Sequence, residues 1–514
     1  MNFAIWHRKF LLLILVIAAL FRLPFLASNP VGFHADEAST GYDAYSIWET
    51  GRDQHGVYFP LFARSFGEYN EALHRYLVAP FVGVLGLNEF AVRLPNALLG
   101  ILTVWVLYHL VLKLWGQVPV ACLAGLFLAI SPWHVQFSRW GARAILLPLF
   151  FCLALLLFQK GRVRPLYWIF SALIFGLALY SYSSARVFVP LFLIGLAWLY
   201  WHDLKRWKVG TLISGCIFLA ILVGLFQFWV TPEGMSRARE LVNLDPIVFA
   251  YSYATYFFPK FLFFHGDPNL RHSLLGMGQL YHFELVLVPL GFWRLWQRKR
   301  AENKVLWLWL ALYPIPAAFT GEPHAIRSLI GAPLFAIFSG WGFYVLWEWS
   351  KKKYRTVAKG VVLVGVFNVL LYLKLFYVDY PKYSGWWWEY GMKEVIAYAE
   401  ERPHLCVLHT HGFYTPFYIH ALFFSQYPPE EYQKLPAELK EKNWAFLNLP
   451  FNDKYLNLDV QDLSFDDGGV ALLVMHPEDV GILDEVAYKW REVHRIYDLS
   501  GVEVIRIIEA GKGM

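Results

Sequence analysis

Two adjacent acidic residues, Asp36 and Glu37, follow the first long apolar run of the chain, in the stretch VGFHADEAST. A carboxylate that faces a bound hydroxyl group can remove its proton as the hydroxyl attacks, which is general base catalysis. The pair also suits the first turn of a helix, where acids interact favourably with the helix dipole, or a solvated loop, or a salt bridge. We treat the pair as a candidate catalytic site within a helix that ends at Gly51.

Arginines recur in polar stretches such as SPWHVQFSRWGAR, YSYSSAR and GEPHAIRS. Arginine offers a planar fork that can bind phosphate through two hydrogen bonds, and it stays charged when partly desolvated. These stretches therefore predict a phosphate-bearing lipid as the ligand, although phospholipid headgroups or loop carboxylates would also satisfy single arginines. The candidate phosphate ligands are Arg64, Arg75, Arg139, Arg143, Arg186, Arg327 and His324.

The composition indicates that these residues are carried by a membrane protein. Of 514 residues, 57% are hydrophobic and only 16% are charged, whereas soluble proteins have about 25% charged residues. Four cysteines show no metal-binding spacing or disulfide framework. The basic start and apolar run at the N-terminus lack an A-x-A cleavage site, so we interpret them as a retained first span. No nucleic-acid partner is expected.

A membrane-spanning helix needs roughly 20 apolar residues, and this criterion gives roughly eleven candidates along the chain. We therefore predict a mainly α-helical, polytopic membrane protein. The predicted spans are 10–27, 93–115, 117–132, 142–159, 165–182, 187–202, 208–230, 281–297, 304–320, 324–348 and 356–377.

The distribution of lysine and arginine predicts the orientation of these spans. With a cytoplasmic N-terminus, every inner loop is short and basic, as in WHRK, QKGRVR, WQRKRAENK and WSKKKYR. The outer side then holds two long loops, which we call the first loop (28–92) and the second loop (231–280). In the first loop, EYNEALHRYLVAPFVGVLG is expected to form an amphipathic helix along the membrane interface.

The character of the sequence changes near residue 380. Helical and strand-like stretches alternate beyond this point, with a hairpin expected around Ser500 and Gly501. We therefore predict a transmembrane domain over 1–380 and a small extracytoplasmic α/β domain over 381–514, in a cell membrane protein with a cytoplasmic N-terminus.

The chain resembles the GT-C-type membrane glycosyltransferases, the superfamily of the protein O-mannosyltransferases and the lipid A aminoarabinose transferase. The resemblance lies in HADEAST, GLNEFAVRLPNALLG, LAISPWHVQFSRWGAR, ALYSYSSARVFVPL and GEPHAIRSLIGAPL, and it covers about the first 380 residues. It implies a transferase that takes a sugar from a polyprenyl phosphate and passes it, with inversion, to a lipid, glycan or protein acceptor. Asp36 would be the general base, and Glu37 would orient the acceptor or the base.

The resemblance also bears on cofactors and on departures from the family. Some relatives hold a metal ion between a first-loop glutamate and a histidine of the second loop, which here implies Glu68 or Glu71 with His272. The aminoarabinose transferases carry an acid–lysine pair where this chain reads GEYNEALHRY, so Arg64 or Arg75 would serve the phosphate instead. The β-trefoil insert of the eukaryotic protein mannosyltransferases has no counterpart, which favours a bacterial or archaeal enzyme.

Two other functions stay open at this stage. One is a transporter or flippase of a polyprenyl-linked glycan, and the other is an oligosaccharide ligase that uses a diphosphate donor. The predicted spans contain few acids and no internal repeat, and the outer charges gather at the predicted membrane boundary. Transporters instead place ionisable residues within their spans and often contain inverted repeats, so these features favour a transferase.

Overall fold

The computed structural model describes residues 3–235, 242–321, 323–351, 354–402, 406–409, 417–435, 448–449, 455–457, 470–485 and 489–511. The chain divides into two compact units. Unit 1 comprises Met1–Leu26 and Asn96–Tyr377, and unit 2 comprises Ala27–Pro95 and Val378–Met514. This division differs from the one predicted at residue 380, because the whole first loop joins the C-terminal segment in one unit.

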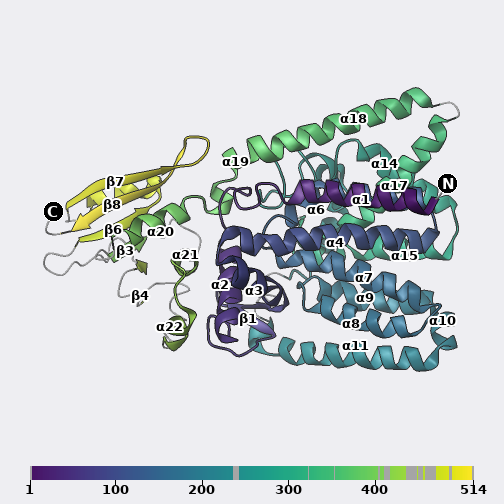
Figure 1. Ribbon diagram of the computed structural model, residues 1–514, viewed down its shortest axis with the longest axis horizontal. Helices are drawn as coiled ribbons and strands as arrows, with labels where there is room; N and C mark the ends of the chain where they lie inside the picture. The colour runs from purple at the N-terminus through teal and green to yellow at the C-terminus, as the bar shows by residue number, and fades with distance from the viewer. Residues whose placement is uncertain are drawn as a thin grey trace. The chain divides into compact units, whose positions relative to one another are not determined.

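Unit 1 is built from long apolar helices that run side by side (Figure 1). Every predicted span overlaps one of them. These helices are α1 (Phe3–Arg22), α4 (Glu89–Trp115, which begins in unit 2), α5 (Val118–Ile130), α7 (Leu146–Gly161), α8 (Leu166–Leu179), α9 (Ala185–Leu199), α11 (Lys208–Trp229), α14 (Glu284–Gln297), α15 (Ala301–Leu312), α17 (Gly331–Ser350) and α18 (Arg355–Lys374). Shorter elements connect them: α6 (Pro132–Phe137), η1 (Arg143–Ile145), α10 (Trp201–Arg206), α13 (Pro246–Thr255), η2 (Lys260–Phe264), α16 (Ile315–Ala318) and η3 (Leu375–Asp379), which reaches into unit 2.

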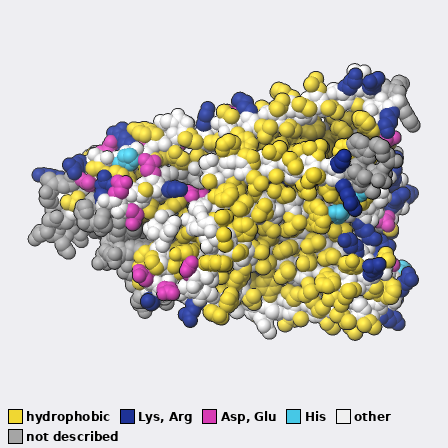
Figure 2. Space-filling view, viewed as in Figure 1, with side chains coloured by type: hydrophobic (Ala, Val, Ile, Leu, Met, Phe, Trp, Pro, Cys, Tyr) yellow, Lys and Arg dark blue, Asp and Glu magenta, His cyan; other side chains and the backbone are white. Residues whose placement is uncertain are grey.

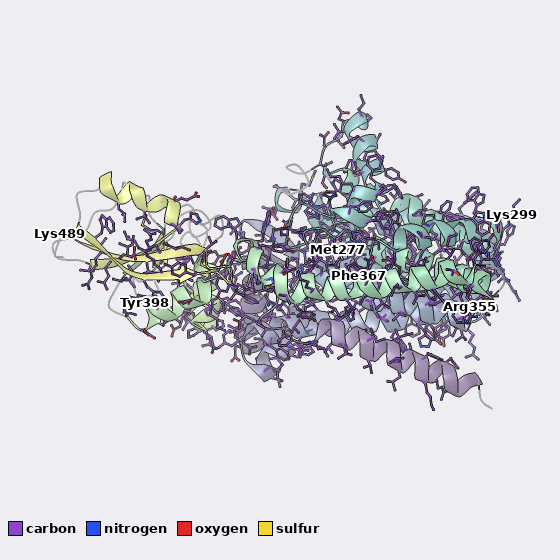
Figure 3. All side chains as sticks on the ribbon, turned by 90° about the horizontal axis from the view of Figure 1, so that it is seen from above. Met277, Lys299, Arg355, Phe367, Tyr398 and Lys489 are labelled. Atoms are coloured by element: carbon purple, nitrogen blue, oxygen red, sulfur yellow. The ribbon has the colours of Figure 1, made fainter. Side chains whose placement is uncertain are left out.

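The surface of unit 1 is that of a membrane protein. Within the described part of the chain, four helical stretches, Glu89–Trp115, Arg143–Gly161, Lys208–Trp229 and Arg355–Tyr383, have the length and apolar composition needed to cross a membrane. Figure 2 shows hydrophobic side chains over the flanks of the helices and Lys and Arg side chains at the end where α1 begins and α10 lies. Lys299 and Arg355 lie at this same end (Figure 3). The basic loops predicted on one side of the membrane thus gather at one end of unit 1.

Helices α14 and α17 approach each other closely at two glycines. A Cβ atom on Gly291 would lie 1.9 Å from the carbonyl oxygen of Phe338, and one on Gly342 would lie 1.9 Å from that of Leu287. Small residues let backbones approach in this way where helices pack inside a membrane. Any larger side chain at either glycine would push the two helices apart.

In unit 2, the first loop folds into α2 (Ala35–Thr50), a β1–β2 hairpin (Phe62–Ser65 and Glu68–Glu71) and α3 (Leu73–Leu85). The predicted helix ending at Gly51 is confirmed, since Gly51 caps α2 in the left-handed conformation. The second predicted helix begins later than expected. Gly67 takes a φ of +79° and turns the chain back on itself, so Glu68–Glu71 pair with β1 as a strand.

The C-terminal part of unit 2 contains a six-stranded sheet in the order β4-β5-β3-β6-β8-β7. Strand β3 is parallel to β5 and β6, and β6, β8 and β7 are antiparallel neighbours. The strands are β3 (Cys406–His409), β4 (Asn448–Leu449), β5 (Tyr455–Asn457), β6 (Val470–Met475), β7 (Lys489–Tyr497) and β8 (Glu503–Gly511). The helical segments are α19 (Tyr380–Tyr383), η4 (Trp386–Trp388), α20 (Met392–Glu400), α21 (Phe417–Phe424), α22 (Pro429–Lys434) and η6 (Pro477–Glu485). The hairpin expected around Ser500 and Gly501 joins β7 to β8.

One hydrophobic core joins the two segments of unit 2. Phe33 and Tyr42 from the first loop are buried in the same cluster as Phe423 and Ile507 from the C-terminal segment. The rings of Phe33 and Phe423 lie 4.6 Å apart. The first loop therefore takes its shape from packing against the last part of the chain.

Candidate functional site

Asp36 is held at the start of α2 with its carboxylate exposed. His34 is the N-cap residue, and its Nδ1 accepts a hydrogen bond from the backbone N–H of Asp36 at 3.1 Å. The side chain of Asp36 is 53% exposed, and its Oδ2 lies 3.6 Å from the same Nδ1. The predicted catalytic acid thus projects from a fixed helix start toward solvent, where it can meet a substrate.

Glu37, the neighbouring acid, is fully buried and paired. Its two carboxylate oxygens each accept a hydrogen bond of 2.9 Å from the guanidinium of Arg93. Arg93 also donates to the backbone carbonyls of Ala27, Pro30 and Gly32. This bidentate pair fastens the segment before α2 and favours a structural role for Glu37, so its predicted catalytic role stays a prediction.

The remaining first-loop candidates lie in the hairpin and in α3. Arg75 is buried, and its Nε lies 2.6 Å from Oδ2 of the equally buried Asp43, so its charge is already balanced inside unit 2. Arg64 pairs across the hairpin with Tyr69, and Glu68 and Glu71 stand on β2. The predicted metal partner of these glutamates, His272, belongs to unit 1, so neither unit alone brings those three residues together.

Unit 1 contains a cluster of three groups that can ligate a metal ion. Donor atoms of Asp267, His272 and His324 all lie within 4.8 Å of one another. Oδ2 of Asp267 lies 2.9 Å from Nδ1 of His272 and 3.7 Å from Nδ1 of His324. It also accepts a hydrogen bond from the backbone N–H of Ala325 at 2.7 Å. Asp267 thereby joins the second loop to the segment before α17.

The electrostatics of this cluster suit a cation. Burial alone raises the pKa of Asp267, but the hydrogen bond and charge of His272 outweigh it and leave the pKa below its ordinary value. Burial, with His272 and Arg327 nearby, lowers the pKa of His324 to about 3, so this imidazole is neutral at pH 7. Nδ1 of His324 is buried and makes no hydrogen bond within the described residues. One carboxylate with two imidazoles is a donor set typical of zinc and related divalent ions.

Three predicted phosphate ligands lie half-buried in unit 1. Arg143 faces the ring of Tyr182 at 5.5 Å, and Arg186 faces the ring of Trp229 at 5.1 Å. The backbone carbonyl of Arg327 accepts a hydrogen bond from Ser184, which ties the segment before α17 to the start of α9. Arg143 and Arg186 thus make cation–π contacts with aromatic side chains of unit 1.

Arg139 differs from these three because it is fully buried against the end of α1. Its guanidinium donates to the carbonyls of Phe21, Arg22 and Pro24 at 3.3, 2.9 and 2.7 Å. Cations at a helix C-terminus satisfy the last carbonyls and the helix dipole. This geometry favours a structural role for Arg139, and its predicted role in binding phosphate stays a prediction.

Sequence reasoning singled out His272, His324 and Arg327 but missed Asp267, although Asp267 stands only five residues before His272 in GDPNLRH. It also missed His34, which precedes Asp36 by two residues. Glu389 and His420 were missed for a different reason: they lie more than three hundred residues away in the chain, and only the fold brings them to His34.

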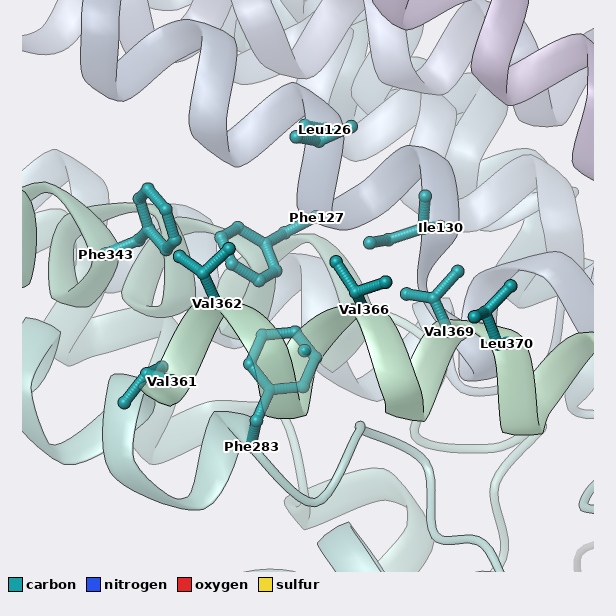
Figure 4. A pocket seen from close by; sticks show the side chains of 11 residues that line it. Leu126, Phe127, Ile130, Phe283, Phe343, Val361, Val362, Val366, Val369 and Leu370 are labelled. Atoms are coloured by element: carbon teal, nitrogen blue, oxygen red, sulfur yellow. The ribbon is translucent and has the colours of Figure 1, made fainter. Parts of the chain in front are cut away.

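An apolar groove lies on the flank of unit 1 between α5, α17 and α18 (Figure 4). It has a volume of about 280 Å³ and no charged side chain in its lining. Its walls are Leu126, Phe127, Ile130, Phe283, Phe343, Val361, Val362, Gly365, Val366, Val369 and Leu370. Such a surface suits a hydrocarbon chain.

Part of the chain matches a known family in sequence, and the whole chain is similar in structure to known proteins. A family model described as dolichyl-phosphate-mannose-protein mannosyltransferase matches residues 72–231. No curated protein matches the chain. ArnT from Cupriavidus metallidurans, bound to undecaprenyl phosphate, is similar with a TM-score of 0.53 and 14% identity, over 99% of this chain and 98% of that one. The chain has the fold of the GT-C membrane glycosyltransferases.

A second similar structure is the oligosaccharyltransferase of Archaeoglobus fulgidus. Its apo form gives a TM-score of 0.51 and 14% identity over 82% of this chain, which spans 64% of that protein's length. The same oligosaccharyltransferase in complex with Zn and sulfate gives a TM-score of 0.51 and 14% identity, over 96% of this chain and 72% of that one. The GT-C resemblance expected from the sequence motifs is therefore confirmed at the level of the fold.

Proposed function

We propose that this chain is an inverting glycosyltransferase that moves a sugar from a polyprenyl-phosphate-linked donor to a lipid, glycan or protein acceptor. The observation that carries the proposal is the exposed carboxylate of Asp36 at the fixed start of α2. In the reaction, Asp36 removes the proton of the acceptor hydroxyl as that oxygen attacks the sugar. The GT-C fold supports this assignment, and so does the motif resemblance around the first-loop acids.

We assign the phosphate of the donor to unit 1. Arg143, Arg186 and Arg327 would balance the charge that develops on the departing phosphate. Asp267, His272 and His324 would hold a divalent metal ion, which when bound would polarise a phosphate oxygen as a Lewis acid.

We further propose that the basic end of unit 1 is cytoplasmic and that roughly eleven helices cross a cell membrane, following the positive-inside rule. The N-terminus is then cytoplasmic, and both long loops and the C-terminal segment lie outside. The gathering of Lys and Arg side chains at one end of the helices supports this orientation (Figure 2).

Transfer of a labelled sugar from a polyprenyl-phosphate donor by the purified protein tests the proposal. Asp36→Asn keeps the shape of the side chain but cannot accept a proton, so we expect turnover to fall by about 10²–10⁴-fold. Glu49→Gln is the matched control, because Glu49 is an exposed acid at the other end of α2. Full activity of Asp36→Asn would remove Asp36 as the base.

The same assay separates the alternatives. A flippase would move the labelled lipid across a vesicle membrane without releasing free polyprenyl phosphate, whereas a transferase releases it. A ligase that uses diphosphate donors would turn over the diphosphate-linked sugar in preference to the monophosphate. Either result would contradict the proposed reaction and favour the corresponding alternative.

A further inference from the structure

Glu389, in the short segment between η4 and α20, is almost fully buried, with 7% of its side chain exposed. Its Oε2 accepts a hydrogen bond of 2.8 Å from the backbone N–H of Ala35, the first residue of α2. Oε2 also lies 2.9 Å from Nε2 of His420, and Oε1 lies 3.2 Å from Nε2 of His34. One buried carboxylate therefore contacts two imidazoles and the start of the helix that carries Asp36.

The contacts of His34 determine which of its nitrogens carries the proton. Nδ1 accepts a hydrogen bond from the backbone N–H of Asp36, so in the neutral ring the hydrogen sits on Nε2, the nitrogen that lies 3.2 Å from Oε1 of Glu389. The same Nδ1 lies 3.6 Å from Oδ2 of Asp36, so a proton that reaches Nδ1 from this carboxylate replaces the hydrogen bond from the backbone N–H. If Nδ1 gains a proton, the imidazolium lies between two carboxylates, Asp36 and Glu389.

His420, the second imidazole in contact with Glu389, helps to keep the carboxylate of Glu389 ionised. Nε2 of His420 lies 2.9 Å from both Oε2 of Glu389 and the carbonyl oxygen of Phe33, and both are acceptors, so this nitrogen donates. Burial raises the pKa of Glu389, but His34 and the hydrogen bond from His420 outweigh it and leave the pKa below its ordinary value. Glu389 is thus ionised at neutral pH.

The backbone of Glu389 also marks the position as unusual. Its φ is +55°, in the left-handed region that residues other than glycine seldom adopt. Such backbone conformations persist where the surrounding structure holds them, and they cluster at functional sites. A glycine would relieve the strain but would remove the carboxylate that faces His34.

We propose that His34, held by Glu389, receives the proton that Asp36 takes from the acceptor hydroxyl; this rests on the glycosyl transfer proposed above. The acceptor oxygen bonds to the anomeric carbon, and the bond from that carbon to the phosphate oxygen breaks, so polyprenyl phosphate leaves with the bonding electrons. The proton passes from the hydroxyl to Asp36 and then to Nδ1 of His34. The carboxylates of Asp36 and Glu389 balance the imidazolium, and Asp36 is ionised again.

In this scheme Asp36 touches the acceptor, whereas His34 and Glu389 are positioning residues that act through it. Among the described residues, the titratable groups beside His34 include Asp36 on α2 and Glu389, and the imidazole of His420 on α21 lies across Glu389. Glu37, the next residue of α2 after Asp36, is paired with the buried Arg93 of α4.

The variant His34→Asn tests the proposal, because asparagine is a strong helix N-cap that has no imidazole. The variant keeps the capping of α2 and removes the imidazole that would store the proton. We expect the melting temperature to stay close to that of the wild type and turnover to fall by about tenfold or more. We also expect the acidic limb of the pH–rate profile to move to lower pH, since the group that holds the proton changes from an imidazole to a carboxyl group, which is the stronger acid. Wild-type turnover with an unchanged pH profile would overturn the proposal.

Glu389→Gln should show the same loss of turnover and the same change in the pH profile, with the KM for the donor unchanged. The matched control is Glu394→Gln, which removes the carboxylate of an exposed glutamate–histidine pair, Glu394 with His494 at 2.8 Å, elsewhere in unit 2. If the three residues act as a unit, the double variant Asp36→Asn/His34→Asn costs no more than Asp36→Asn alone. Additive losses would contradict the relay.

The two proposals fail in different ways. If the wild-type protein transfers no sugar from a polyprenyl phosphate, the proposed function fails. If Asp36→Asn is inactive while His34→Asn and Glu389→Gln match the wild type, the function stands and the role of His34 fails.

Discussion

At the scale of single residues, Asp36 and Glu37 show how neighbours of the same chemistry take different tasks. A helix turns by about 100° per residue, so adjacent side chains leave α2 in different directions. The carboxylate of Asp36 points to solvent, and that of Glu37 points inward onto Arg93. A buried pair of this kind costs stability when one partner is removed, because the other charge is left uncompensated. Loss of activity in a Glu37 variant therefore needs a measurement of folding beside it.

The three side chains of unit 1 that could hold a metal ion give a second prediction for single residues. We expect the purified protein to bind one divalent ion, with zinc as the probe, at Asp267, His272 and His324. Asp267→Asn removes the negative charge that balances the cation, so zinc affinity should fall by about tenfold or more. Elemental analysis after dialysis and a competition titration with a chelator measure this. His265→Gln is the control, because His265 is exposed in the same loop.

Equal zinc content in Asp267→Asn and the wild type would contradict this assignment. In that case the contact between Asp267 and His272 would be an ordinary buried acid–histidine pair. Zinc that is lost equally from the His265→Gln control would point to adventitious binding by the loop.

The sequence predicted part of this site and missed the rest for physical reasons. His272 and His324 stand in motifs whose polar character is visible among apolar neighbours. Asp267 falls in a Gly-Asp-Pro turn, a context in which aspartate most often serves only the turn itself. Here it does both: Oδ1 accepts from the backbone N–H of Asn269 and Oδ2 faces the histidines.

At the scale of elements, α18 forms one wall of the apolar groove and is otherwise mostly exposed along its length. A helix with apolar residues on all sides and little protein around it is solvated by lipid tails. The groove between α18 and α5 is therefore a place where a long isoprenoid chain can lie against protein on one side and lipid on the other (Figure 4).

A larger side chain in the groove should raise the KM of donors with long isoprenoid chains and leave the KM of donors with short chains unchanged. Val366→Trp places a large ring in the groove, and displacing two methylene-sized groups, at about 0.8 kcal/mol each, would raise KM for a long-chain donor by about tenfold. A donor with a ten-carbon chain should be unaffected. Leu363→Trp is the matched control, because Leu363 is 71% exposed on the same helix and lies outside the groove. An equal effect on both donors would place the isoprenoid chain elsewhere.

Helix positions in unit 1 could be predicted because hydrophobic length alone decides them. The order of the six strands could not, because pairing between β3, β5 and β6 depends on segments far apart in the chain. The β1–β2 hairpin was missed because GEYNEALHRY has helical periodicity, and the turn at Gly67 prevails over it. Local patterns thus predicted the helices and failed where tertiary pairing decides.

At the scale of the whole molecule, the first loop and the C-terminal segment share one core although nearly three hundred residues of unit 1 separate them in the chain. Phe423 of α21 packs directly on α2, where a Cβ atom on Gly41 would lie 2.6 Å from its ring. The C-terminal segment therefore supports the helix that carries Asp36.

Phe423→Ala should loosen the packing of α2, although residue 423 is far from α2 in the sequence. Removing a buried phenylalanine costs about 3–5 kcal/mol, and we expect the amides of α2 to exchange hydrogen faster in the variant. Hydrogen–deuterium exchange with mass spectrometry on the purified protein measures this for residues 35–50. Leu499→Ala is the control, since Leu499 is 54% exposed at the tip of the β7–β8 hairpin. Unchanged exchange in α2 would show that the first loop holds its shape alone.

The shared core also has a consequence for how the chain is made. Phe33 and Tyr42 are synthesised early, whereas Ile507, which is buried in the same core, comes roughly 470 residues later, about 25–95 s at ribosomal rates of 5–20 residues per second. During that interval the α2 segment has left the ribosome without the partners that bury its apolar face. The chain therefore cannot complete the packing around the start of α2 while translation is in progress, and a ribosome that stalls late leaves a chain whose unit 1 helices are complete but whose Asp36 has no fixed place.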